Sequence, residues 1–254
     1  MGMEGNLVNN MAFTAGSDSL APDKPTLIFI HGAGLTRQLW QAQVTSLCDI
    51  ANTVAVDLPG HGQSPGEAGE DIAAYADAVL GFVEKIKAPR PIVCGLSMGG
   101  AVAVDLLLRH GSRFIGGVLM HSGAKLKVHP LMFETLDKGI DGYFELMLYY
   151  AVAPENANNS MARQIQDIAV RSSAVARADF TACNAFDRMD AVSRIDASVL
   201  VITGNEDNIT PKKYGRYLAD QISGSRHENI DGAGHLSPLE RPEKVNRLLR
   251  QFVY

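Results

Sequence analysis

A short stretch in the first half of the chain combines a strand pattern, a tight turn and a helix pattern. Residues 91–96 are mostly apolar, Ser97 stands between Gly95 and Gly99, and an apolar helical pattern continues to about His110. A serine on a strained turn between strand and helix needs small neighbours, because a Cβ two residues away would clash. The turn also sets the hydroxyl beside the first amides of the helix. The stretch predicts a nucleophile at Ser97, although a plain glycine turn fits the same letters.

Strand and helix patterns alternate along most of the chain, and this predicts an α/β protein. Amphipathic helices are expected between runs of apolar, β-branched residues that are typical of buried parallel strands. These runs lie at residues 26–30, 53–57, 91–96, 115–120 and 199–202. Alternation of this kind requires a parallel sheet with right-handed crossovers. A short exposed hairpin is expected near the N-terminus, from Asn6 to Phe13 and the turn residues that follow.

The alternation stops between about residues 124 and 196. A structureless loop of that length is uncommon inside a compact domain, so this span should have helices of its own. Helical patterns occupy residues 130–136, 140–151, 160–172 and 175–186, with Ser160 as an N-cap. We expect most apolar side chains of the span to pack against the body. A few, with Tyr143, Phe144 and Met147 as candidates, should line the roof of a pocket.

Composition excludes several classes of protein. A chain of 254 residues with 46% hydrophobic residues fits one α/β domain or a domain with an insert. A net charge of -5 without a basic cluster argues against nucleic-acid binding, because phosphates are bound by concentrated Lys and Arg. Three widely spaced cysteines without a secretory signal pattern indicate reduced thiols and a cytoplasmic location. No apolar segment is long enough to predict a membrane span.

The best candidate for a catalytic acid follows the strand at residues 199–202. Asp207 lies in the loop after this strand, before Pro211 at the expected first turn of the next helix. Because ligands bind at the carboxyl ends of parallel strands, Asp207 should lie at the same sheet edge as the nucleophile. Asp207 could instead cap the helix. Glu206 beside it and Asp231 further along are the competing acids.

A histidine stands in the equivalent place after the next strand. Residues 227–230 form a short strand pattern, and His235 follows in a glycine-rich loop. This position brings His235 to the edge where Ser97 and Asp207 are expected. The chain order Ser97, Asp207, His235 is that of α/β-hydrolase triads and differs from the orders of the two other common serine hydrolases.

Five segments in the same order resemble the α/β-hydrolase superfamily. They are residues 31–34, 57–64, 95–100, 204–207 and 232–235. Within the superfamily, the chain resembles the small bacterial esterases, lactonases and carbon–carbon hydrolases. The resemblance implies a mostly parallel eight-stranded sheet flanked by helices, with a helical lid inserted after the sixth strand. It implies a core domain of residues 1–123 and 197–254 and a lid of residues 124–196.

The resemblance also implies how the site works. His235 would take the proton of Ser97 and return it to the leaving group, while Asp207 fixes the histidine tautomer. The backbone amides of Ala33 and Met98 would form the oxyanion hole, with the amide of Gly34 as the fallback. No cofactor or metal is expected, because the chain lacks metal-binding and phosphate-binding motifs.

Three functions remain open from the sequence. The favoured one is hydrolysis of a small carboxylic ester or lactone, with no nucleic-acid or membrane partner and with a homo-oligomer left open. The second is cleavage of a carbon–carbon bond in a vinylogous diketone acid, which would need a cationic group such as Arg37, Arg188 or Arg194 for the carboxylate. The third is a ligand-binding receptor with little turnover.

Two polar groups outside this site receive structural predictions. His61, between two glycines, is expected to serve the structure of its own loop. Asp105 and Arg109 are spaced by four residues, so they are expected to pair on the surface of their helix.

Overall fold

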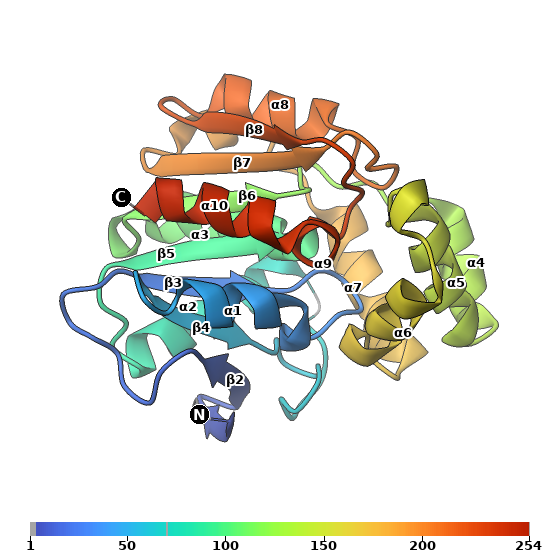
Figure 1. Cartoon of the computed structure of the whole chain (residues 1–254), viewed down its shortest axis with the longest axis horizontal. Coiled ribbons are helices and arrows are strands. Elements are labelled where there is room, and N and C mark those ends of the chain that lie inside the picture. Colours follow the sequence, from blue (N-terminus) through green and yellow to red (C-terminus); the bar gives the residue numbers. More distant parts are fainter. Residues whose placement is uncertain (1–3, 70, 254) are drawn as a thin grey trace.

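An eight-stranded sheet forms the centre of the computed structural model, which describes residues 4–69 and 71–253 (Figure 1). The strands lie in the order β1-β2-β4-β3-β5-β6-β7-β8, and β3 to β8 pair in parallel. Their bounds are β1 (Glu4–Val8), β2 (Met11–Ala15), β3 (Thr26–Ile30), β4 (Asn52–Val56), β5 (Pro91–Leu96), β6 (Gly116–Met120), β7 (Ser198–Gly204) and β8 (Arg226–Ile230). The predicted mostly parallel, eight-stranded α/β sheet is confirmed.

Helices cover both faces of the sheet, which explains why its central parallel strands are largely apolar, whereas the edge strand β8 is mostly polar. Along β3, Leu27 and Phe29 join one hydrophobic cluster while Ile28 and Ile30 join the other, as the two-residue period of a strand requires. One face is covered by α1 (Gln41–Leu47) and α10 (Pro242–Val253), the other by α2 (Ile72–Lys85), α3 (Met98–His110) and α8 (Lys213–Gln221) (Figure 1). The short helix α9 (Ser237–Glu240) precedes α10.

The N-terminal hairpin forms, but the prediction that it is exposed is wrong for its second strand. The chain reverses at Asn9 and Asn10, both with positive φ, rather than at the later turn-forming residues 16–23. Asparagine tolerates this left-handed conformation, as two-residue hairpin turns require. β2 pairs with β4, and Phe13 on it packs edge-on against Phe82 of α2. The hairpin therefore completes the core at the sheet edge.

In the described chain, four α-helices and two short 3-10 helices lie between β6 and β7, where the strand pattern stops. The α-helices form the bulk of this segment. They are α4 (Pro130–Asp137), α5 (Asp141–Tyr150), α6 (Asn159–Ile168) and α7 (Ser173–Ala185). Asn158, not Ser160, caps α6, because its side chain accepts from the amides of Ser160 and Met161. These helices gather at one end of the molecule (Figure 1). We call them the insert; its treatment as a lid domain of residues 124–196 stays a prediction.

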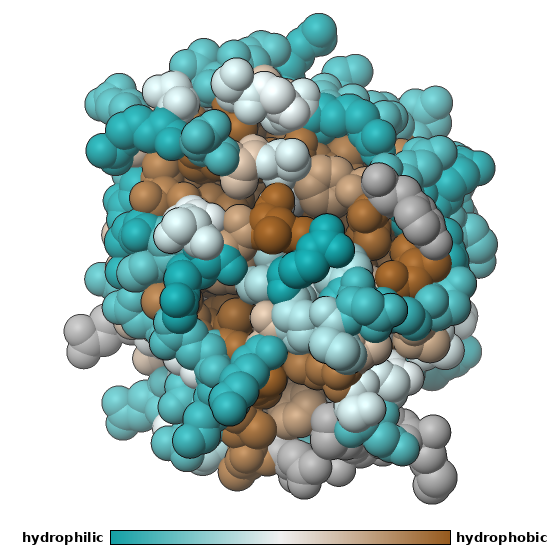
Figure 2. Space-filling view, turned by 90° about the vertical axis from the view of Figure 1, so that its left-hand side faces the viewer, coloured by the Kyte–Doolittle hydropathy of each residue, from teal (hydrophilic) through white to brown (hydrophobic). Residues whose placement is uncertain are grey.

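At the end of the molecule opposite the insert, the surface mixes hydrophilic and hydrophobic residues, as is common on water-exposed proteins. Hydrophilic residues surround smaller hydrophobic areas there (Figure 2). In the described part of the chain, no helix combines the length and apolarity that a membrane crossing needs.

Candidate active site

Ser97 lies on a strained turn between β5 and α3. Its φ is 55° and its ψ is -114°, a backbone conformation that residues other than glycine rarely adopt. A Cβ on Gly95 would lie 1.9 Å from the carbonyl oxygen of Gly99, and one on Gly99 would lie 2.3 Å from that of Ile30. The two glycines are therefore required by close backbone contacts, as the G-x-S-x-G pattern predicts.

His235 and Asp207 lie together at the same end of the sheet. The Nδ1 atom of His235 is 3.0 Å from Oδ2 of Asp207 and 3.2 Å from Oδ1. His235 and Ser97 line the same small cavity of about 30 Å³, although no hydrogen bond joins them among the described residues. Glu206 and Asp231 instead bond to neighbouring asparagine side chains. Of the three competing acids, Asp207 is the one in contact with His235.

The carboxylate of Asp207 accepts hydrogen bonds from five donors. The amides of Ile209 and Thr210 donate to Oδ1, at 2.9 and 2.8 Å. The Thr210 hydroxyl and the Nδ1 atoms of His121 and His235 lie against Oδ2. Burial raises the pKa of Asp207, but the charge of His235 and the hydrogen bonds from both histidines outweigh burial and hold this pKa well below its usual range. Asp207 is therefore a stable buried anion.

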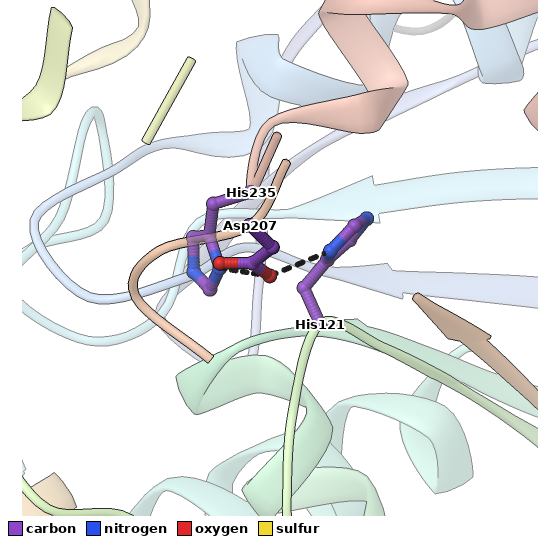
Figure 3. Close-up of side chains that lie close together, drawn as sticks. All are labelled: His121, Asp207 and His235. Atoms are coloured by element: carbon purple, nitrogen blue, oxygen red, sulfur yellow. Dashed lines mark hydrogen bonds and ion pairs between the residues drawn. The ribbon is translucent and has the colours of Figure 1, made fainter. Parts of the chain in front are cut away.

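The second histidine on this carboxylate, His121, was missed by the sequence reasoning. It directly follows β6, so the strand-end argument that found His235 could also have found it. The two imidazoles approach the carboxylate of Asp207 from different sides (Figure 3). Ligand atoms of the three residues lie within 4.8 Å of one another, a spacing that a metal ion could use. Hydrogen bonds at 2.9 and 3.0 Å already join both rings to the carboxylate, so the cluster is satisfied without a cation.

The two predicted oxyanion amides flank Ser97. Met98 is the first residue of α3, so its N–H has no acceptor within the helix. Gly32 and Ala33 line the small cavity together with Ser97. The fallback amide, that of Gly34, is already engaged, because it donates to Oδ2 of Asp179 at 2.7 Å. This engagement argues against the fallback, while the oxyanion role of Ala33 and Met98 stays a prediction.

Asp179 is a buried carboxylate of α7 that ties the insert to this loop. Besides the Gly34 amide, it accepts from Nε2 of His61 at 2.8 Å and from the hydroxyl of Tyr75 at 2.5 Å. Sequence reasoning missed it, because an acid in the middle of a helix has no local signal for such a role.

Further contacts hold the same loop against the insert. The hydroxyl of Tyr143 donates to the carbonyl oxygen of Ala33 at 3.0 Å, and the amide of Val170 donates to that of Gly34 at 2.9 Å. Insert and loop are therefore joined through both side chains and backbone.

His61 carries a positive charge in this network. Its Nδ1 lies 3.0 Å from the carbonyl oxygen of Pro59 and its Nε2 lies 2.8 Å from Asp179, and both partners are acceptors. Both ring nitrogens must then carry protons. Burial lowers the pKa of His61, but the charge and hydrogen bond of Asp179 outweigh burial and raise this pKa above its usual value. The predicted loop role of His61 is thus incomplete: the ring also pairs with the insert.

A family model for the alpha/beta hydrolase family matches residues 27–248. The chain belongs to this family. The match confirms the resemblance and the fold class inferred from the sequence.

Several relatives of this hydrolase are esterases or lactonases by name. A pimeloyl-[acyl-carrier protein] methyl ester esterase of Neisseria meningitidis is 32% identical, over 91% of this chain and 94% of the relative. A 3-oxoadipate enol-lactonase of Acinetobacter baylyi is 27% identical, over 90% and 88%. The crystal structure of an enol-lactonase from Burkholderia xenovorans has a TM-score of 0.87 and 24% identity, with 96% of each chain covered. That structure supports the fold alone.

A larger cavity of about 270 Å³ opens beside Ser97 of the hydrolase. Its lining is mostly apolar and comes largely from the insert and the segment before it. Among the lining residues are Leu126, Val128, Leu131, Met132, Leu146, Tyr150 and Phe180. Lys125, Lys127 and His129 also line it. The cavity suits an apolar substrate group placed next to the serine.

The predicted roof residues are only partly right. Met147 lines the small cavity, but Tyr143 and Phe144 line neither cavity. Both are buried against the body, and Tyr143 bonds to the loop after β3. Helical spacing identified the buried face of α5 but could not say which part of that face borders the cavity.

The three arginines considered as carboxylate anchors also lie outside both cavity linings. Arg37 is buried and pairs with Asp57. Arg188 pairs with Asp105 at 2.9 Å, and Arg109 pairs with the same carboxylate at 2.5 Å. The pairing of Asp105 with Arg109 is confirmed, but its placement on the surface is wrong, because Asp105 is fully buried.

Proposed function

We propose that this hydrolase cleaves a small carboxylic ester or lactone through an acyl-enzyme formed on Ser97. One observation carries the proposal: Ser97 and His235 share a cavity, and the other side of His235 is bonded to the buried carboxylate of Asp207. The relatives support the substrate class, since their names describe a methyl ester esterase and an enol-lactonase. At the level of a carboxylic ester hydrolase, the prediction from sequence is confirmed by these relatives.

Proton transfer is assigned to His235. A serine hydroxyl is a weak nucleophile, so Nε2 of His235 takes its proton as the oxygen attacks the substrate carbonyl. Asp207 keeps the proton of the neutral ring on Nδ1 and stabilises the imidazolium that forms. His235 then protonates the leaving alcohol. Water repeats the sequence to release the acid.

Stabilisation of the negative charge that develops on the substrate carbonyl oxygen is assigned to the backbone amides of Ala33 and Met98. Two observations support the assignment: Ala33 lines the small cavity together with Ser97, and the amide of Met98 stands at the N-terminus of α3, where the helix dipole favours negative charge. One such donor contributes about 3 kcal/mol to transition-state stabilisation.

Neither alternative function is favoured by a specific contact. Carbon–carbon cleavage would need a cation to hold the substrate carboxylate. The three arginines considered for that role do not line the cavity; Lys125 and Lys127 do, and Lys125 pairs with Asp187. A ligand-binding receptor would retain the same fold, and its low rate of substrate turnover would distinguish it from an ester hydrolase. The cytoplasmic location, the absence of nucleic-acid and membrane partners and the oligomeric state stay predictions.

A hydrolysis screen tests the proposal. Purified protein and a Ser97→Ala variant are compared on p-nitrophenyl esters, lactones and a vinylogous diketone acid. We expect turnover of esters or lactones by the wild type and loss of that turnover in the variant. Preferential cleavage of the diketone acid, or binding without turnover, would contradict the proposal.

Covalent labelling tests the nucleophile directly. A fluorophosphonate probe should modify Ser97 and leave Ser97→Ala unmodified, as mass spectrometry of the digested protein would reveal. Modification of Ser64 or Ser122, or labelling that persists in the variant, would show that the nucleophile is misassigned.

A further inference from the structure

A second Ser–His–Asp array lies behind the proposed catalytic one. The hydroxyl of Ser237 is 2.7 Å from Nε2 of His121, and Nδ1 of His121 is 2.9 Å from Oδ2 of Asp207. This order of atoms matches the order assigned to Ser97, His235 and Asp207. Ser237 and His121 have no exposed surface, so a substrate cannot reach this second serine. The array cannot form an acyl-enzyme, yet it ends on the same carboxylate.

The hydrogen bonds fix where the protons of this array lie. Asp207 is ionised and accepts, so Nδ1 of His121 carries a proton and donates it. In a neutral imidazole with this proton, Nε2 is an acceptor, and it accepts the hydrogen bond that the Ser237 hydroxyl donates. Ser237 therefore holds His121 in the tautomer that donates to Asp207.

We propose that His121, oriented by Ser237, is a positioning residue that lowers the basicity of Asp207 and, through it, of His235. The inference rests on the proposed function of Ser97 and His235. A donor on the carboxylate stabilises its negative charge and leaves less of that charge to stabilise the His235 imidazolium. The two rings also oppose double protonation, since their centroids are 5.6 Å apart. His121 thus keeps His235 unprotonated, and active as a base, to lower pH.

Other ionisable groups around the array are engaged elsewhere. Glu206 bonds to Asn205, and Lys125 after β6 pairs with Asp187. The buried carboxylate of Glu240 in α9 accepts from backbone amides, including that of Gly234. From α8, Tyr214 lines the larger cavity, while Lys212 and Lys213 at its start are exposed. In the described part of the chain, the ionisable groups that act directly on Asp207 are the two histidines.

Three variants separate loss of the hydrogen bond from His121 to Asp207 from other effects of substitution. His121 has a φ of 48°, which asparagine tolerates well. His121→Asn keeps a donor near the position of Nδ1, whereas His121→Leu fills similar space without one. Ser237→Ala leaves the ring in place and removes only the group that fixes its tautomer.

The readout is the rate at which a fluorophosphonate labels Ser97 as a function of pH. In His121→Leu, the acidic limb of this profile should move to higher pH by about half to one unit. At a pH on that limb, and with each rate normalised to its own plateau, labelling of His121→Leu should be about three- to tenfold slower than that of the wild type. His121→Asn should stay close to the wild type, and Ser237→Ala should shift in the same direction as His121→Leu by a smaller amount. The limb is read within each variant, so it does not depend on the fraction folded.

The outcomes distinguish this inference from the function on which it rests. If wild-type Ser97 is not labelled, the proposed function fails. If the wild type is labelled and the limbs of His121→Leu and Ser237→Ala coincide with it, His121 is only structural and the inference is wrong. A limb in His121→Asn that moves as far as in His121→Leu also overturns the role of the donor. Should His121→Leu fail to fold, Ser237→Ala and His121→Asn decide the question alone.

Discussion

Asp207 accepts hydrogen bonds from backbone amides and a hydroxyl as well as from His235, so its substitution should affect both catalysis and stability. In Asp207→Asn, one oxygen becomes an NH₂ group that cannot accept, so donors on that side lose their partner. The variant also loses the charge that stabilises the imidazolium of His235. We expect kcat to fall by about three to four orders of magnitude, together with a lower melting temperature.

Two neighbouring acids serve as controls. Among the residues that the structure describes, the side chains of Glu206 and Asp231 bond to nearby asparagines alone, so the kcat of Glu206→Gln and of Asp231→Asn should stay near that of the wild type. Steady-state kinetics below the melting temperature of each variant makes the comparison. A near-normal kcat in Asp207→Asn, together with an inactive Glu206→Gln, would show that Glu206 and not Asp207 is the catalytic acid.

At this scale, the sequence supports predictions about residues that follow strands. Gly95 and Gly99 mark the turn at Ser97, and the strand-end rule brings Asp207 and His235 to the same edge. Their chemical roles stay proposals. His121 escaped notice because a histidine directly after a strand was not compared with His235. Asp179 has no such signal, since its partners lie more than 100 residues away in the chain.

Among the elements, α5 offers a matched pair of side chains for testing the cavity. Tyr150 lines the larger cavity, whereas the adjacent Tyr149 is 76% exposed and does not. Tyr150→Ala should enlarge the space beside Ser97 and raise the activity on long-chain relative to short-chain p-nitrophenyl esters. Tyr149→Ala should leave that ratio unchanged. Equal changes in both variants would argue that the cavity does not receive the acyl chain.

The link between α7 and the core can be tested through Asp179. In Asp179→Asn, the buried His61 imidazolium loses its counter-charge, a change that typically costs about 3–5 kcal/mol of unfolding free energy. The Gly34 amide also loses a charged acceptor, so kcat should fall more than KM changes. Urea unfolding and steady-state kinetics measure the two effects. Unchanged kcat in a destabilised variant would confine Asp179 to a structural role.

The number of helices in the insert was predictable, but their contacts were not. Apolar spacing locates the buried face of α5, while the partner of that face depends on how the helices fold back on the sheet. This is why Tyr143 and Phe144 proved to be packing residues rather than cavity residues.

For the molecule as a whole, His31 should make the free energy of unfolding depend on pH in the acidic range. Its Nδ1 lies against the carbonyl oxygen of Gly32 and its Nε2 accepts from the amide of Leu58, so the ring is neutral. Burial, and secondarily the charge of His61, lowers the pKa of His31 to about 3. Between pH 6.5 and 3 the unfolded chain therefore binds a proton that the folded chain does not. The free energy of unfolding should fall as the pH falls through this range.

Urea unfolding at several pH values measures this dependence. His31→Asn lacks the titrating group, so its unfolding free energy should fall less steeply across the same range, whatever its value at neutral pH. Parallel curves for the two proteins would assign the acid sensitivity to other groups.

The general architecture was predictable because the central parallel strands are largely apolar, unlike the edge strand β8, and glycine-rich loops follow several of them. The hairpin was placed less well, since the turn signal at Asn9 and Asn10 is weaker than that of the Gly-, Ser-, Asp- and Pro-containing residues 16–23 beyond it. Its burial depends on a pairing with β4, some 40 residues later, that local sequence does not encode.

The ion pair between Asp179 and His61 also limits how this enzyme could be redesigned. Grafting the insert of another hydrolase onto this core would leave a buried cation without its anion unless the new segment supplied an acid at the same place. The loop carrying Ala33 would lose its anchor in the same step. Chimeras that exchange the insert together with residues 31–36 and 57–64 should therefore retain more activity than chimeras that exchange the insert alone.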